Sequence, residues 1–178
     1  MRVLAAILGT GLLAGAQPAA AQELFVGALV HGVETPLTFE TGEGGADIQA
    51  GVRFAPSEAL SVIGKPSPYI MVSANTAGDT SFAGAGLSWT VGKGRFYLRP
   101  GIGLVVHDGP SYRVDPATQL RTDLGSRVLF APEVGAGVRL GPRWSAEASW
   151  VHISHARLFG GQNPGIDTIG VRINYRLR

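Results

Sequence analysis

The alternation of apolar and other residues at every second position constrains the fold of this chain more than any other feature. Eight runs of about ten residues show this period, and clusters of Gly, Pro, Asp, Asn and Ser separate them. No segment keeps the 3.6-residue period of an amphipathic helix. The runs cover residues 24–32, 46–54, 61–74, 80–91, 95–107, 127–140, 143–154 and 166–177. The pattern predicts an all-β domain of antiparallel strands.

The connections between these runs alternate in length. Short ones fall at 92–94 and 141–142, whereas long ones fall at 33–45, 108–126 and 155–165. An even number of antiparallel strands with short turns at one rim and long loops at the other is typical of an outer-membrane barrel. A soluble eight-stranded barrel or sandwich would show the same spacing.

The two faces of each strand distinguish these alternatives. In the run 46–54, one face carries only Ala, Ile, Val and Phe, and the other carries Asp47, Gln49, Gly51 and Arg53. Glycine mixed with opposite charges suits the narrow lumen of a barrel whose apolar face contacts lipid. We therefore predict an eight-stranded antiparallel outer-membrane β-barrel, with a soluble periplasmic lipid-binding barrel as the alternative. The predicted lumenal charge network comprises Arg53, Arg99, Glu133, Arg139 and Glu147.

The N-terminus has the organisation of an export signal. A positively charged start, an apolar stretch over residues 3–16 and three alanines before Gln22 follow one another. The apolar stretch is shorter than the roughly 20 residues of a membrane-spanning helix. We expect residues 1–21 to be a signal peptide and residues 22–178 to form the barrel domain, located in the bacterial outer membrane.

Composition excludes several classes of function. The chain has no cysteine, which excludes disulfides, cysteine nucleophiles and metal sites with Cys ligands. Its formal net charge is only +2, too little for the basic groove of a nucleic-acid-binding protein. We expect no metal, no other cofactor and no nucleic-acid partner.

Polar residues interrupt the apolar face of the last predicted hairpin. The outward row of the run 143–154 ends in His152 and Ser154, and Asp167 belongs to the outward row of the next run. If paired residue numbers sum to about 319, His152 lies opposite Asp167, with Cβ atoms about 5 Å apart. Ser154 stands about 6.6 Å further along the strand.

This placement predicts a nucleophilic serine site at the external rim. His152 would take the proton of Ser154, while Asp167 would hold the other ring nitrogen. Taken singly, each residue also fits an ordinary position at the membrane interface. An ionisable group that faces lipid is costly unless it has a function, so three on one face favour a site turned toward the outer leaflet.

The same hairpin resembles the lipid A 3-O-deacylases of the PagL family. Residues 152–156 read His-Ile-Ser-His-Ala and residues 163–167 read Asn-Pro-Gly-Ile-Asp. The family pattern is His-x-Ser-Asn-Ala, a short loop, and Asn-x-Gly-Ile-Glu. The resemblance implies an outer-membrane hydrolase that removes the ester-linked acyl chain at the 3-position of lipid A, without a metal.

The resemblance also assigns roles to individual residues. Ser154 matches the nucleophile, His152 the general base and Asp167 the acidic member. The backbone N–H of Ala156 matches an oxyanion donor, Asn163 matches a loop Asn near the site, and His155 replaces the family's Asn. Further departures are Arg157, where a small residue is common, and a loop one residue longer. External arginines expected to meet lipid A phosphates are Arg113, Arg121 and Arg157.

The expected partners are lipid A or lipopolysaccharide and the outer membrane itself, and the sequence leaves open whether the chain forms a homodimer. A non-enzymatic small barrel, structural or a narrow pore, is the alternative function. In that case the last hairpin would carry no chemistry.

Overall fold

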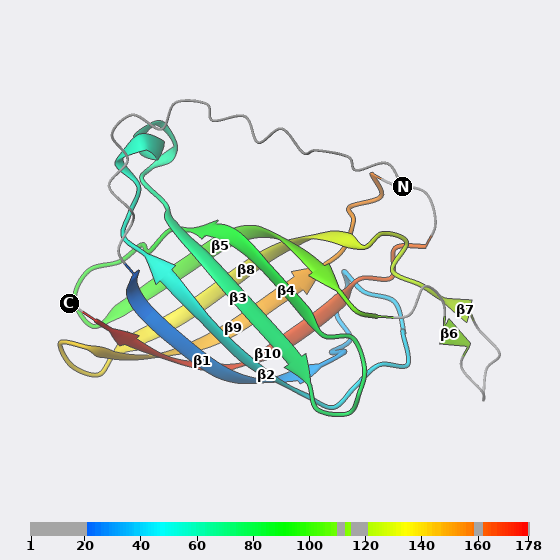
Figure 1. Ribbon diagram of the computed structural model, residues 1–178. Helices are drawn as coiled ribbons and strands as arrows, with labels where there is room; N and C mark the ends of the chain where they lie inside the picture. Colours follow the sequence, from blue (N-terminus) through cyan, green and yellow to red (C-terminus); the bar gives the residue numbers. More distant parts are fainter. Residues whose placement is uncertain (1–20, 110–112, 115–120, 159–161, 178) are drawn as a thin grey trace, which may run out of the picture.

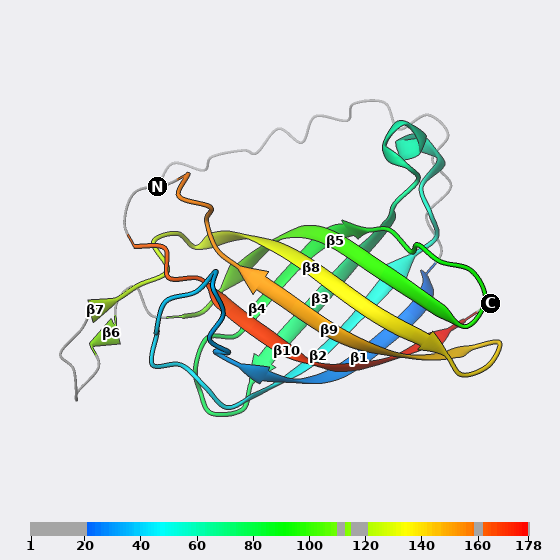
Figure 2. The ribbon, with the colours of Figure 1, turned by 180° about the vertical axis from the view of Figure 1, so that it is seen from behind.

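The computed structural model describes residues 21–109, 113–114, 121–158 and 162–177, and its strands close into one barrel (Figures 1 and 2). All neighbouring strands pair antiparallel, in the order β1-β10-β9-β8-β5-β4-β3-β2 around the wall. They are β1 (Ala21–His31), β2 (Ala46–Phe54), β3 (Ser67–Asn75), β4 (Phe82–Ser88), β5 (Phe96–His107), β8 (Val128–Arg139), β9 (Trp144–Ile153) and β10 (Ile166–Arg176). The predicted eight-stranded antiparallel barrel is confirmed.

Three small elements were not expected from the sequence. The 3-10 helix η1 (Glu58–Ile63) precedes β3, and the two-residue strands β6 (Arg113–Val114) and β7 (Arg121–Thr122) form a hairpin outside the barrel. The expectation of a strand over 61–74 was therefore wrong at its start. Gly64 adopts a left-handed φ of 89° that ends the helix, so the strand begins only at Ser67. Among the described residues, no helix is long and apolar enough to cross a membrane.

The two ends of the barrel differ in their connections. We call the end that carries loops 32–45, 76–81, 108–127 and 154–165 the loop rim. The opposite end, the turn rim, holds η1, the start of β1 and the end of β10, and Figure 1 shows η1 on the opposite side from β6 and β7. The expected signal peptide lies outside the described residues except for Ala21, at which β1 begins.

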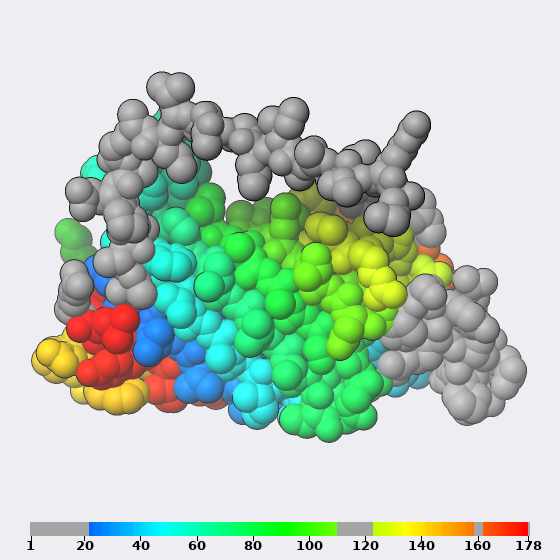
Figure 3. Space-filling model, viewed as in Figure 1, coloured from blue at the N-terminus to red at the C-terminus, as the bar shows by residue number. Residues whose placement is uncertain are grey.

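The outer wall of the barrel is apolar, as predicted. On the side viewed in Figure 3, the side chains of β2, β3 and β4 form a continuous outer surface. Outward residues such as Ile48, Ile70 and Leu104 are exposed, whereas the alternate residues of the same strands, such as Asp47 and Tyr69, are buried in the lumen. The arrangement is that of a barrel surrounded by lipid rather than water.

The lumen contains a network of ion pairs that includes Glu23 and Arg172, two residues beyond those expected. Its contacts are Arg99–Glu147 at 2.9 Å, Arg99–Glu23 at 3.0 Å, Arg172–Glu133 at 2.8 Å, Arg172–Glu147 at 3.6 Å and a close Arg53–Glu23 pair. Among the ion pairs of the described residues, Arg139 takes no part in this network. Its guanidinium donates instead to the carbonyl oxygens of Gly94 and Phe96 at the turn rim. The ion pairs neutralise charges whose burial in the lumen would otherwise cost free energy.

Glycines make room for this crowded interior. The hydroxyl of Tyr69 lies against Gly86 on β4 and Gly103 on β5. A Cβ atom would stand 2.5 Å from this hydroxyl at Gly86 and 2.8 Å from it at Gly103. The expected glycines on the lumen face therefore have a packing function, because a narrow barrel cannot hold both a large ring and a Cβ opposite it.

Replacing Glu147 by Gln should destabilise the barrel by about 3–5 kcal/mol, because two buried guanidinium groups then share one carboxylate fewer. Urea unfolding in detergent, followed by tryptophan fluorescence, measures the loss. Glu58→Gln is the matched control: Glu58 pairs with Lys65 at 2.8 Å on exposed η1, and its loss should cost less than about 1 kcal/mol. Equal losses would contradict a structural role of the lumenal network.

Candidate active site

Strand pairing brings together the residues that the sequence singled out. In the β9–β10 ladder, His152 pairs directly with Asp167, which is the register expected from the sum of 319. Ser154 follows β9 and is held by β8, because its backbone N–H and carbonyl both hydrogen bond with Phe130, at 3.0 and 2.8 Å. Three adjacent strands thus set the relative positions of the three side chains.

The three side chains form a continuous hydrogen-bonded chain. The Nδ1 atom of His152 lies 2.7 Å from Oδ1 of Asp167, and Nε2 lies 2.9 Å from Oγ of Ser154. An ionised carboxylate can only accept, so Nδ1 carries the ring proton and Nε2 is left to accept from the serine hydroxyl. A hydroxyl, a base and an orienting acid in this order can generate a serine nucleophile.

The site is covered, although its residues belong to the outward row. Only 8% of His152 and 8% of Ser154 are exposed, and Asp167 is fully buried. Loops 32–45 and 154–165 cover it from two sides: the N–H of Val33 donates to the carbonyl oxygen of Asp167 at 3.0 Å, and that of Phe39 to Pro164 at 2.9 Å. The site that the sequence predicted on the outward face is therefore mostly buried, and Ser154 and His152 are more exposed than Asp167.

Loop 154–165 contains the remaining predicted site residues. The Oδ1 atom of Asn163 accepts the backbone N–H of His155 at 2.9 Å, and the buried ring of His155 contacts the carbonyl oxygen of Gln162 at 2.9 Å. Ala156 and Arg157 follow with left-handed φ of 52° and 57°, and both are exposed. Asn163 and His155 thereby hold the loop closed, and the two left-handed residues turn it directly after Ser154.

Gly165 determines how closely the chain approaches the imidazole. Its φ is +68°, and a Cβ at this position would stand 2.7 Å from Cε1 of His152. Gly165 is one of the residues that match the family pattern in the sequence, but only the structure shows that it lies against the imidazole of His152. A side chain here would both strain the backbone and displace the ring.

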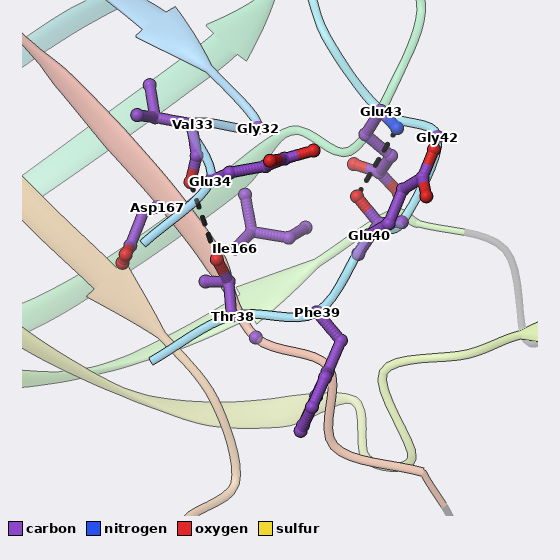
Figure 4. A pocket seen from close by; sticks show the side chains of 12 residues that line it. Gly32, Val33, Glu34, Thr38, Phe39, Glu40, Gly42, Glu43, Ile166 and Asp167 are labelled. Carbon is purple, nitrogen blue, oxygen red and sulfur yellow. Dashed lines mark hydrogen bonds between the residues drawn. The ribbon is translucent and has the colours of Figure 1, made fainter. Parts of the chain in front are cut away.

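Loop 32–45 contributes residues that sequence reasoning missed. The hydroxyl of Thr35 donates a short hydrogen bond to Oδ2 of Asp167. A pocket of about 130 Å³ lies between this loop and the start of β10, and Figure 4 shows Asp167 at its edge near Val33 and Thr38. Because the loop has no periodic pattern, the sequence contained no signal that would have placed Thr35 at the site.

The far end of the same loop is anchored in the lumen. Nε2 of His31 lies 2.9 Å from a Glu43 carboxylate oxygen, and the hydroxyl of Thr80 donates to Glu43 at 2.8 Å. Burial alone would raise the pKa of the Glu43 carboxyl, but the hydrogen bonds from His31 and Thr80 outweigh it and hold that pKa below its usual value. The loop therefore has a charged attachment to the barrel.

The three external arginines lie at the loop rim, as expected. Arg113 begins β6, Arg121 begins β7 and exposed Arg157 lies in loop 154–165. Their role stays a prediction. Across the described ranges, no group of three or more His, Cys, Asp or Glu side chains is arranged to hold a metal ion.

The chain is similar to a known protein family and to solved barrel structures. The family model described as "Lipid A 3-O-deacylase (PagL)" matches residues 45–176. The crystal structure of the outer membrane enzyme PagL superposes with a TM-score of 0.61 at 15% identity, covering 86% of this chain and 98% of that one. A de novo designed transmembrane β-barrel reaches 0.50 at 13% identity, over 89% and 98%. These two likenesses show the fold alone, and no curated protein sequence matches.

Replacing Gly165 by Ala should displace His152 and slow the reaction of Ser154 with a fluorophosphonate probe by about 10²-fold, the cost of a misplacement near 1 Å. Mass spectrometry of the labelled peptide measures the rate. Gly141→Ala is the control, since a Cβ there meets no atom within 4 Å. Unchanged labelling of the Gly165 variant would show that the close approach of Gly165 does not determine the position of the His152 imidazole.

Proposed function

Because the chain belongs to the lipid A 3-O-deacylase (PagL) family, whose members are ester hydrolases of the outer membrane, we propose that it hydrolyses the 3-position ester of lipid A through Ser154, His152 and Asp167. The observation that carries this assignment is the unbroken chain of hydrogen bonds, 2.9 Å from Ser154 to His152 and 2.7 Å from His152 to Asp167. It lies on the outward row of the wall, beside the membrane.

The first half of the proposed reaction transfers the acyl group to the enzyme. The Oγ atom of Ser154 attacks the ester carbonyl carbon while Nε2 of His152 removes the hydroxyl proton. The resulting imidazolium then gives this proton to the 3-oxygen of the sugar as the carbon–oxygen bond breaks. Asp167, already bonded to Nδ1, stabilises the imidazolium throughout.

The second half releases the fatty acid. His152 takes a proton from water, whose oxygen attacks the acyl-serine carbonyl, and then returns the proton to Oγ of Ser154. The products are a 3-hydroxy fatty acid and lipid A with a free 3-hydroxyl. The negative oxygen that forms in each half needs a donor, and we assign this function to the backbone N–H of Ala156, in the left-handed turn after Ser154. His155 and Asn163 hold that turn in place.

The position of the site supports a substrate that arrives sideways from the outer leaflet. Trp150 lies next on the outward row, its ring centroid 6.3 Å from that of His152, and Ile169 on β10 is 41% exposed. A lipid can therefore contact the wall below the site without entering the lumen. Arg157, Arg113 and Arg121 at the loop rim are our candidates for the lipid A phosphates.

Export of the chain follows from the same proposal. A barrel in the outer membrane must first cross the inner membrane, and we assign residues 1–21 as the signal peptide that directs this step. The support is that the barrel wall starts where cleavage is expected: the carbonyl oxygen of Gln22 accepts from Leu177 at 2.9 Å, and Glu23 pairs with Arg176.

Ser154→Ala and His152→Ala should each abolish deacylation. Lipid A from cells that express the wild-type chain should lose the mass of one 3-hydroxy acyl group, and lipid A from either variant should keep it, as mass spectrometry of extracts measures. Heat-modifiable mobility of the variants checks that the barrel has folded. A folded wild-type chain that leaves lipid A unchanged would favour the structural or pore-like alternative.

Asp167→Asn should lower kcat by roughly 10³- to 10⁴-fold, because an amide that donates to Nδ1 stabilises the wrong tautomer of His152. Because Asp167→Glu keeps the charge, it should retain more activity than the Asn variant. Its longer side chain at a fully buried position should still lower activity below that of the wild type. Release of 3-hydroxy fatty acid from lipid A in detergent measures both. Equal activity of the Asn variant and the wild type would remove Asp167 from the mechanism.

A further inference from the structure

We infer that Thr35 is a positioning residue of the catalytic site, a fourth member of the hydrogen-bonded chain that begins at Ser154. The inference rests on the proposed function, since it concerns how Asp167 is oriented for that reaction. Loop 32–45, which supplies Thr35, almost entirely precedes the residues 45–176 that match the family model.

The buried carboxylate of Asp167 needs two partners. It is fully buried, so each of its oxygens requires a hydrogen-bond donor in place of water. His152 serves Oδ1 and Thr35 serves Oδ2. One bond alone would leave the carboxylate free to turn about its last torsion, which has only a broad preference. Two bonds on opposite oxygens hold its plane and keep Oδ1 directed at Nδ1.

The direction of the Thr35 hydrogen bond is determined by its neighbours. Its Oγ1 atom accepts the backbone N–H of Leu37 at 3.1 Å. The hydroxyl proton is then available for the carboxylate, which can only accept. The backbone N–H of Thr35 in turn donates to Oγ1 of Thr38 at 3.0 Å. The loop thus holds the hydroxyl in a donating orientation toward Asp167.

The loop itself is attached on both sides of Thr35. Val33 bonds to the backbone of Asp167 and Phe39 bonds to Pro164, so the loop follows the start of β10 closely. Further on, Glu43 connects to His31 and Thr80 in the lumen. A hydroxyl on a loop held in this way can orient a side chain with little entropic cost, since the loop is already ordered.

The test compares Thr35→Val with Thr35→Ser in the full-length enzyme in detergent, with purified lipid A as substrate. We expect the Val variant to lose roughly 10- to 100-fold in kcat, the effect of one hydrogen bond to a charged group, with KM unchanged. The Ser variant, which keeps the hydroxyl, should restore kcat. Heat-modifiable mobility confirms folding of each variant.

Thr41→Val is the matched control. Thr41 lies in the same loop, and its hydroxyl accepts only the N–H of Glu43 at 3.3 Å among its described contacts. It should keep the wild-type kcat and KM. The inference is overturned if Thr35→Val reacts as the wild type does, if Thr35→Ser fails to restore kcat, or if Thr41→Val loses as much kcat as Thr35→Val. Failure of the proposed function looks different: wild type and Ser154→Ala would then release equally little fatty acid.

Discussion

The antiparallel register between β9 and β10 is the constraint on which the site depends, because it decides which residues face each other across the last hairpin. Side chains alternate between lumen and exterior, so a slip of one residue would send either His152 or Asp167 into the lumen. The pairing of these two residues is set within a ladder that runs from Ile166 opposite Ile153 to Tyr175 opposite Trp144. The geometry of the site is therefore part of the barrel wall.

The lumen supplies the rigidity that such a site requires. Arg99 and Arg172 each contact two carboxylates, and glycines on the facing strands let rings and guanidinium groups fill the narrow interior. A catalytic arrangement tolerates displacements of only about 0.5 Å. Stability and the proposed chemistry thus belong to the two faces of one sheet: the ionic lumen maintains the wall, and the wall carries the serine, the histidine and the carboxylate on its other side.

Two loops supply contacts of the site that the barrel wall does not provide. Loop 154–165 brings Gly165 against the imidazole and turns sharply at Ala156, while loop 32–45 covers Asp167 and satisfies its second oxygen. A carboxylate on the outward row would be costly next to lipid. Buried between two loops and bonded on both oxygens, it is instead a well-placed partner of His152, and the serine and histidine keep the small exposure that a substrate needs.

The sequence by itself determined the number of barrel strands and their inward and outward faces, because a period of two is a local property that survives in a linear chain. The pairing of His152 with Asp167 was predicted only on the condition that paired residue numbers sum to about 319, and the β9–β10 register meets that condition. The sequence was misleading at the start of β3, where the left-handed Gly64 ends a 3-10 helix, and at Arg139, whose guanidinium donates to the carbonyl oxygen of Gly94 at the turn rim. Only the tertiary structure decided that Asp167 is buried, that Gly165 touches the imidazole and that Thr35 reaches a carboxylate 132 residues away. These features depend on how loops without any period fold back over the wall, and hydrogen bonds between distant parts of the chain leave no repeat in the sequence from which they could be read.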